Sequence, residues 1–420
     1  MLRIHAFLLV LLLALAARPA AGYAVLTHQA NIDSTWERCL VPAILKRYPG
    51  STPEQLIDAK AYAYGGAIIQ DMGYYPFGSV LFTNLTHYVR SGDFIRNLIL
   101  EARDLNDYAF ALGALAHYSA DLDGHAEGTN RALPLVYPEL KAKYGDVVTY
   151  EQAPKQHGQL EFSFDVMQLA SGKYHTQDYH QKIGFKVSKS PLERAFLKTY
   201  GLELGQVIVN VDLSIASYRF AVSQLIPMAA RAAWHYKRKD IMELNPGVRR
   251  RYYMARNHPK AFRKEFGKEY QKPGFGARIV SYFIRVLPKL GPLKPFAFKL
   301  PTPEAGKVFR ASFRKVMVSY CVNVGRQPAD TAAAPFTLSN ADFDTGHPTR
   351  AGEYGLADET YGEWLRKLAG KEFENLNPVA RQNILTFYGL QPKTPASAEE
   401  KERNKQQETQ AALEQLRAYH

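Results

Sequence analysis

The chain has 420 residues, of which 46% are hydrophobic and 22% are charged. This composition is typical of a globular protein and excludes a disordered chain, and the length allows one large core or two smaller ones. The formal net charge of +13 favours polyanionic partners, namely anionic lipid, nucleic acid or phosphate esters. Charge alone does not choose among these three.

The first 22 residues have the pattern of a signal peptide. Arg3 gives a basic start, residues 6–17 form an apolar run, and small residues follow at 20–22. The run is too short to span a bilayer, and no later segment has the length and apolarity of a membrane span. We therefore expect cleavage after Gly22, a mature chain that begins at Tyr23, and export to the periplasm or the medium.

Two cysteines, Cys39 and Cys321, are the only ones in the chain. They either form one disulfide in an oxidising compartment or remain two buried thiols, and the sequence does not report the distance between them. No Cys-x-x-Cys pair occurs, which argues against a zinc site built from thiolates.

Residues 23–236 have apolar positions at helical spacing, as in Leu105, Tyr108, Leu112 and Leu115, and few alternating runs. We predict an all-α fold, a multi-helix bundle with a helical C-terminal extension. Residues 207–236 are expected to form one long buried helix within it.

The remainder divides by composition into three expected parts: a basic, aromatic-rich region (237–315), a small helical subdomain (316–395) and a charged tail (396–420). The basic region is either a solvated helical face with a core stripe or a surface that docks on anionic membrane. The tail is expected to be a frayed exposed helix or disordered.

Histidines and carboxylates recur at helical spacing. The stretch HYSAD places His117 and Asp121 four residues apart, and HGQLE does the same for His157 and Glu161. Such pairs lie on one face of a helix, and imidazole and carboxylate are good zinc ligands. One pair alone is more often a surface ion pair, but His117 follows an apolar run and is expected to be buried, where it needs a partner.

Two further features contain candidate metal ligands. His28 lies five residues after the expected mature terminus, whose amine is a candidate metal ligand. The stretch DFDTGH, with Asp342, Asp344 and His347, either binds a cation or makes a turn, and the turn is the better-supported interpretation.

The constellation as a whole resembles the zinc-dependent phospholipase C family, whose fold is shared with single-strand-specific nucleases. It is also similar to the catalytic domain of glycosylphosphatidylinositol-specific phospholipase D. The resemblance covers about residues 23–234. The family's ordered ligand pattern is met here by Tyr23, His28, Asp71, His87, His117, Asp121, His125, His157 and Glu161.

The resemblance implies three zinc ions. Asp71, His87, His117 and Asp121 would hold the first ion, Asp121, His28 and the amine and carbonyl of Tyr23 the second, and His125, His157 and Glu161 the third. Asp71 would also serve as general base to a metal-bound water.

One departure from the family pattern concerns the third ion. Characterised phospholipases place its histidine six residues after the bridging aspartate, where this chain has Glu127. His125 comes four residues after Asp121, as in the phospholipase D branch, and we favour His125.

We therefore expect an exported zinc-dependent phosphodiesterase, a phospholipase C that hydrolyses phospholipids and contacts anionic membrane through residues 237–315. Three alternatives stay open at this point: a nuclease on the same metal site, a phospholipase D-like activity, and a non-catalytic, zinc-stabilised binding protein of the envelope.

Overall fold

The computed structural model describes residues 25–170, 185–222, 298–327, 336–389 and 400–419, together with residue 239. Within these ranges the fold is all-α, as predicted, and the only β pairing is an isolated bridge between Ala341 and Pro348. The elements are α2 (Val25–Thr35), η1 (Trp36–Leu40), α3 (Val41–Arg47), α4 (Pro53–Gly66), η2 (Ile69–Tyr74), α5 (Val80–Tyr88), α6 (Ser91–Leu100), α7 (Leu105–Gly124), η3 (His125–Thr129), α8 (Asn130–Val136), α9 (Pro138–Tyr144), α10 (Pro154–Ala170), α12 (Lys189–Tyr200), α13 (Leu204–Val207), α14 (Val211–Phe220), α19 (Pro303–Gly325), α20 (Gly355–Ala369), α21 (Pro378–Gly389) and α22 (Glu400–Ala418).

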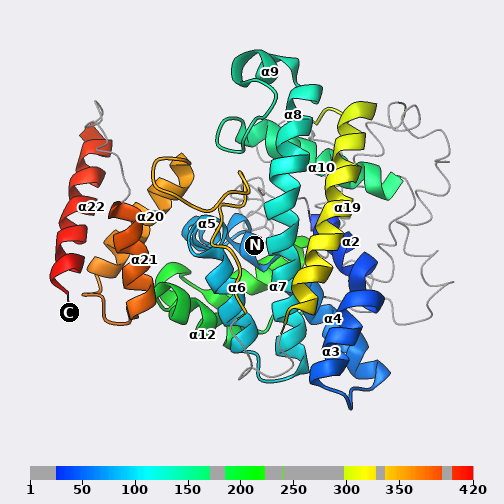
Figure 1. Ribbon diagram of the computed structural model, residues 1–420, viewed down its shortest axis with the longest axis horizontal. Helices are drawn as coiled ribbons and strands as arrows, with labels where there is room; N and C mark the ends of the chain where they lie inside the picture. The colour runs from blue at the N-terminus through cyan, green and yellow to red at the C-terminus, as the bar shows by residue number, and fades with distance from the viewer. Residues whose placement is uncertain are drawn as a thin grey trace, which may run out of the picture.

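Helix α7 lies at the centre of the molecule, where α2, α4, α6 and α19 pack against it (Figure 1). Asp104 caps its N-terminus by accepting a hydrogen bond from the backbone N–H of Asp107 at 2.8 Å. Every residue from Tyr108 to Asp121 is buried, so this helix contacts protein on all sides rather than along one stripe. Its polar residues therefore need partners within the protein.

Glycines allow α4 and α7 to approach at backbone distance. A Cβ atom added to Gly113 would lie 2.1 Å from the carbonyl oxygen of Ala63, and one added to Gly66 would lie 2.0 Å from that of Phe110. Neither position has room for a side chain. The close crossing brings the end of α4 to the middle of α7, where the polar residues begin.

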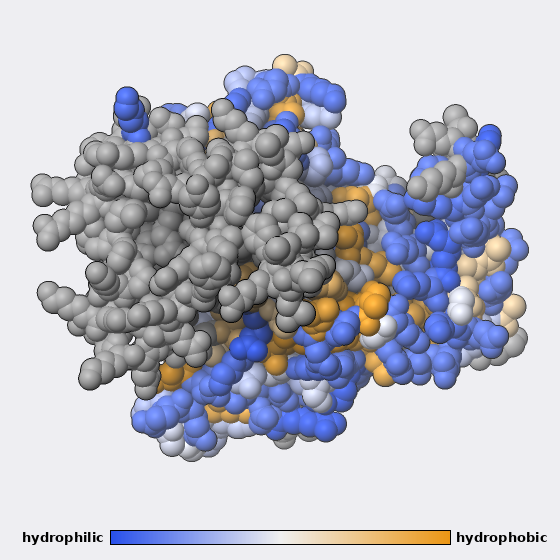
Figure 2. Space-filling model, turned by 180° about the vertical axis from the view of Figure 1, so that it is seen from behind, coloured by the Kyte–Doolittle hydropathy of each residue, from blue (hydrophilic) through white to orange (hydrophobic). Residues whose placement is uncertain are grey.

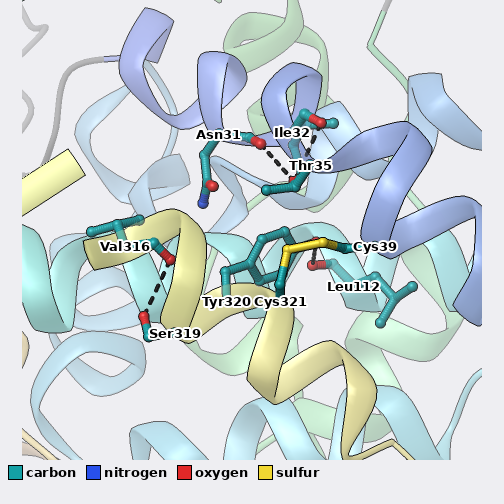
Figure 3. Close-up of a disulfide and its surroundings, with 9 residues drawn as sticks. All are labelled: Asn31, Ile32, Thr35, Cys39, Leu112, Val316, Ser319, Tyr320 and Cys321. Atoms are coloured by element: carbon teal, nitrogen blue, oxygen red, sulfur yellow. Dashed lines mark hydrogen bonds between the residues drawn. A yellow bond between two sulfur atoms is a disulfide. The ribbon is translucent and has the colours of Figure 1, made fainter. Parts of the chain in front are cut away.

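A disulfide joins Cys39 in η1 to Cys321 in α19, with the two Cα atoms 5.5 Å apart (Figure 3). Next to it, the hydroxyl of Tyr320 donates a hydrogen bond to the carbonyl oxygen of Leu112 at 2.8 Å. The covalent link and the hydrogen bond hold α19 on α7 and on the N-terminal helices. The sequence had left this pairing open.

The C-terminal helices continue the same core. Helix α20 packs on α5, and the indole N–H of Trp364 donates to the carbonyl oxygen of Tyr200 at 2.8 Å. Ala412, Leu413 and Leu416 of α22 are buried against this part of the core. The tail therefore forms a helix from residue 400 that is largely exposed, as one of the two expectations had it, but its second half packs on the core through these three apolar residues.

The expected division of the chain into domains stays a prediction, although α19 runs without a break across the expected boundary at residues 315–316. The signal peptide, Tyr23 and most of the basic region lie outside the described residues. The long helix expected from residue 207 is interrupted: α13 ends at Val207, α14 begins at Val211, and Val209 between them is fully exposed. Among the described residues, no helix is both long enough and apolar enough to cross a membrane.

Loss of the disulfide should lower the stability of the folded protein markedly. The bond closes a loop across a sequence separation of 282 residues, and we expect the Cys39→Ser/Cys321→Ser double variant to lose about 3–5 kcal/mol of unfolding free energy. Urea unfolding with and without reductant measures the effect. Reductant should lower the wild-type midpoint and leave the double variant unchanged; an unchanged wild-type midpoint would contradict the role assigned to the bond.

Candidate metal centre

Eight of the nine predicted ligands lie within the described residues, and the structure brings all eight into one buried region. They come from six elements far apart in the sequence, and none is more than 3% exposed. They are His28 from α2, Asp71 from η2, His87 from α5, His117 and Asp121 from α7, His125 from η3, and His157 and Glu161 from α10.

Helix α7 and the turn that continues it present three of these side chains on one face. His117, Asp121 and His125 follow one another at steps of four residues, which places them in a row along the helix. The α-helix ends at Gly124, and a π-helical turn from His125 to Thr129 continues it. Such turns are frequent at functional sites, and this one sets the direction in which His125 leaves the helix.

The first cluster consists of Asp71, His87, His117 and Asp121. Distances between its ligand atoms match those between ligands of one ion. Two ligands of a tetrahedral zinc ion, each about 2.0–2.1 Å from the metal, lie about 3.3 Å apart. Nε2 of His87 lies 3.3 Å from Asp71 Oδ1, 3.4 Å from Asp121 Oδ2 and 3.3 Å from Nε2 of His117. Nε2 of His117 is 3.2 Å from Asp121 Oδ2.

Asp121 faces a second group with its other oxygen. Its Oδ1 lies 3.4 Å from Nε2 of His28, whose ring stacks on that of His117 with centroids 4.2 Å apart. Both carboxylate oxygens of Asp121 are buried and have no hydrogen-bond partner among the described residues. The two oxygens of one carboxylate therefore face two candidate ion positions, as a bridging ligand requires.

A third cluster lies beyond Asp121. Oε1 of Glu161 is 2.8 Å from Nε2 of His157 and 3.5 Å from Nε2 of His125. Glu127, the alternative to His125, is half exposed and pairs with Lys315 on α19. The structure therefore brings His125 into the site and leaves Glu127 outside it.

Main-chain carbonyl oxygens orient the two histidines of the first cluster, by contact with the ring nitrogen that faces away from the cluster. Nδ1 of His87 lies 2.8 Å from the carbonyl oxygen of Thr83, and Nδ1 of His117 lies 3.0 Å from that of Ala67. A carbonyl oxygen only accepts, so Nδ1 of each ring carries a proton and Nε2 faces the cluster. The Ala67 carbonyl reaches His117 because α4 and α7 cross at their glycines.

The charge states of the side chains also suit a metal. Burial lowers the pKa of His157 and is the main cause of the lowered pKa of His28, so both rings are neutral near pH 7. Burial alone would raise the pKa of Asp121, but the surrounding imidazoles of His117, His125 and His28 outweigh it and keep the carboxylate ionised. Neutral imidazole and ionised carboxylate are the forms that bind zinc, so these three groups fit this ion, whereas His87 must first lose a proton.

The start of α2 is fixed by a buried carboxylate that the sequence did not single out. Asp165 of α10 accepts hydrogen bonds from the backbone N–H groups of Leu26 and Thr27 at 3.0 and 3.1 Å. Burial raises the pKa of Asp165 to about 7, although these hydrogen bonds oppose the rise. The contact holds the first turn of α2, and with it His28, against α10. The expected ligand Tyr23 precedes the described residues.

The structure adds Asp344, which the sequence analysis had assigned to a turn. Asp342 does make that turn, because its Oδ1 accepts the N–H groups of Asp344 and Thr345 at 2.8 and 3.1 Å, and His347 is exposed. Asp344, however, is buried with Oδ1 3.4 Å from Nδ1 of His125. No local spacing signals this contact, since His125 and Asp344 are far apart in the sequence.

Three groups of buried side chains therefore have ligand atoms within 4.8 Å of one another. They are His28, His117 and Asp121; Asp71, His87 and His117; and His125, His157 and Asp344. Such clusters of imidazole and carboxylate can hold divalent cations. The first two groups share His117, and the carboxylate of Asp121 lies within 3.4 Å of histidines from both.

Comparison with known proteins agrees with this geometry. Residues 27–208 match the model of a family described as zinc dependent phospholipase C. That range contains all eight described ligands, and it ends well before Asp344. No curated protein and no solved structure matches the chain significantly.

Zinc binding to the metal-free protein should release protons near pH 7.5 and weaken as the pH falls. Burial lowers the pKa of His87, but the adjacent Asp121 and Asp71 outweigh it and raise the pKa to about 9, so zinc must displace this proton. Calorimetric titration in buffers of different ionisation enthalpy measures the release. It should shrink at pH 10, and a binding enthalpy independent of the buffer at pH 7.5 would refute the expectation.

Proposed function

We propose that this chain, whose residues 27–208 match the zinc-dependent phospholipase C family, is an exported phosphodiesterase that acts on phospholipids. The observation that carries the proposal is the position of Asp121. Its two oxygens face His28 on one side and His87 and His117 on the other. A shared carboxylate between two ion positions is typical of sites that hydrolyse phosphate esters.

The chain's residues have separate roles in this proposal. His28, Asp71, His87, His117, Asp121, His125, His157 and Glu161 would hold zinc, and Tyr23 would complete the set. Bound zinc would supply Lewis-acid stabilisation of the phosphoryl oxygens and a water of lowered pKa. Asp71 has Oδ1 toward His87, and we assign to its carboxylate the proton of the attacking water.

The ring of Phe343 excludes solvent on one side of the site. It is fully buried and packs on His87 and His117, with ring centroids 5.1 and 6.2 Å apart. Exclusion of water strengthens the electrostatic interactions of the charged groups inside. No protein nucleophile is required, because water attacks the phosphorus.

Apolar surface near Asp71 supports a lipid as the substrate. Phe77 follows η2, the element that carries Asp71, and Ser217 of α14 donates a hydrogen bond to the neighbouring Pro76 carbonyl. Phe77, Leu213 and Phe220 are 40–43% exposed. Apolar residues also gather over the middle of one face of the molecule (Figure 2). Exposed apolar groups beside an active site favour contact with a membrane surface.

The disulfide supports export. Disulfides persist in the periplasm and outside the cell and are rare in the cytosol. The bond between Cys39 and Cys321 is therefore consistent with the signal peptide expected from residues 1–22. Fractionation of cells that express the full chain, with N-terminal sequencing of the product, tests both points.

His117→Ala should abolish phosphodiester hydrolysis, reducing the rate to that of an enzyme-free blank, because His117 belongs to two of the candidate clusters. The matched control is His347→Ala, which removes an exposed imidazole and should keep the wild-type rate. A chromogenic phosphodiester reports the rate. Hydrolysis by His117→Ala at the wild-type rate would overturn the proposed site.

Parallel assays on phosphatidylcholine, phosphatidylinositol and single-stranded DNA identify the substrate. Release of diacylglycerol marks phospholipase C, and release of phosphatidate marks a phospholipase D-like reaction. Cleavage of DNA alone would replace the lipid proposal with a nuclease, and no cleavage of any substrate by a zinc-loaded protein would favour a binding protein.

A further inference from the structure

The third cluster differs from the first in the group behind its histidine. His87 and His117 place Nδ1 against main-chain carbonyl oxygens, which point Nε2 into the cluster. His125 has a carboxylate there instead, since Asp344 Oδ1 lies 3.4 Å from its Nδ1. Asp344 comes from the segment between α19 and α20, outside residues 27–208.

We infer that Asp344 is a positioning residue for His125: it accepts the proton on Nδ1 and so directs Nε2 toward Glu161 and Asp121. An ionised carboxylate has no proton to donate, so the proton between the two groups lies on Nδ1. This fixes the tautomer of the ring. Carboxylates behind metal-bound histidines commonly play this part and raise the basicity of the imidazole. The inference rests on the metal centre of the proposed function, but not on the identity of the substrate.

Other contacts occupy most of the acceptor positions of the Asp344 carboxylate. Oδ2 accepts hydrogen bonds from the backbone N–H of Tyr150 and from the hydroxyl of Tyr354, both at 2.8 Å. Oδ1 accepts one from Nδ2 of Asn130 at 3.2 Å. A carboxylate has about four acceptor positions, so these three donors leave one, and His125 lies beside it.

The atoms opposite Asp344 agree with this direction. Nε2 of His125 is 3.5 Å from Oε1 of Glu161, and the same oxygen is 2.8 Å from Nε2 of His157. These three atoms converge without any contribution from Asp344. The alternative, in which His125 binds the metal through Nδ1 together with Asp344 and His157, would leave the approach of Nε2 to Glu161 without an ion.

The segment that carries Asp344 also makes hydrogen bonds to elements around the first cluster. The backbone N–H of Phe343 donates to the carbonyl oxygen of His87 at 3.2 Å, and the hydroxyl of Ser91 donates to that of Ala341 at 2.6 Å. The turn made by Asp342 and the bridge from Ala341 to Pro348 hold its shape. Asp344 is therefore fixed relative to His125 from several directions.

Zinc titration of four proteins tests the inference: wild type, Asp344→Asn, Asp342→Asn and His157→Ala. Asp344→Asn should weaken one zinc ion by about 10- to 100-fold and leave the others unchanged, with the full zinc count restored at high free zinc. Asp342→Asn is the matched control, because Asp342 is also buried in the same turn but faces backbone N–H groups. It should bind zinc as the wild type does, whereas His157→Ala should lose one ion.

The outcomes separate this inference from the metal centre itself. A wild-type protein that binds no zinc refutes the metal centre. A wild type that binds zinc, with Asp344→Asn equal to it, refutes the role of Asp344 alone. Loss of the ion from Asp344→Asn to the same extent as from His157→Ala would make Asp344 a ligand and would also overturn the inference.

A measurement on the wild type reports the tautomer of His125 directly. Nitrogen-15 NMR of the zinc-loaded protein, labelled at histidine, reports which ring nitrogen carries the proton; the His125 signals are assigned by their absence in His125→Gln. The inference predicts a proton on Nδ1 and metal on Nε2 of His125. Metal on Nδ1 would contradict it, and a purely structural role of Asp344 would not fix either state.

Discussion

The structure depends on the burial of many ionisable side chains in one place. Four imidazoles surround the carboxylate of Asp121 within the core of a helical bundle, and that carboxylate is fully buried. Unpaired charges are costly in such surroundings, so these groups must compensate one another or bind an ion. The separations of 3.2–3.4 Å around Asp121 are longer than those of charge-assisted hydrogen bonds and match those of ligands around zinc.

The fold provides the rigidity that this arrangement needs. Helix α7 and its continuation η3 carry three of the candidate ligands through the centre, the glycines of α4 and α7 bring a carbonyl oxygen behind His117, and the disulfide fixes α19 alongside. Each histidine of the first cluster is held by a main-chain group, whose position is set by helix packing and not by a flexible side chain. The site is therefore preorganised by the packing of the whole bundle.

Much of this could be predicted from the sequence, for identifiable reasons. Helical periodicity predicts the all-α fold, and a step of four residues places His117 and Asp121 on one helix face. The ordered ligand pattern indicates the family, and residues 27–208 match its model. Two features had no local signal. The disulfide depends on a distance between residues 39 and 321, and Asp344 depends on how the C-terminal segment folds over η3; neither distance is written in residue spacing. The break before α14 was missed because an apolar run does not distinguish buried from exposed residues.

The central claim is that the buried cluster is a multinuclear zinc centre in which Asp121 is shared by two ions. Crystals of the mature protein grown with zinc, measured on both sides of the zinc absorption edge, give an anomalous map that locates each ion directly. The account predicts three peaks, two of them on either side of Asp121 and the third between His125, His157 and Glu161. At most one peak within the cluster would contradict it.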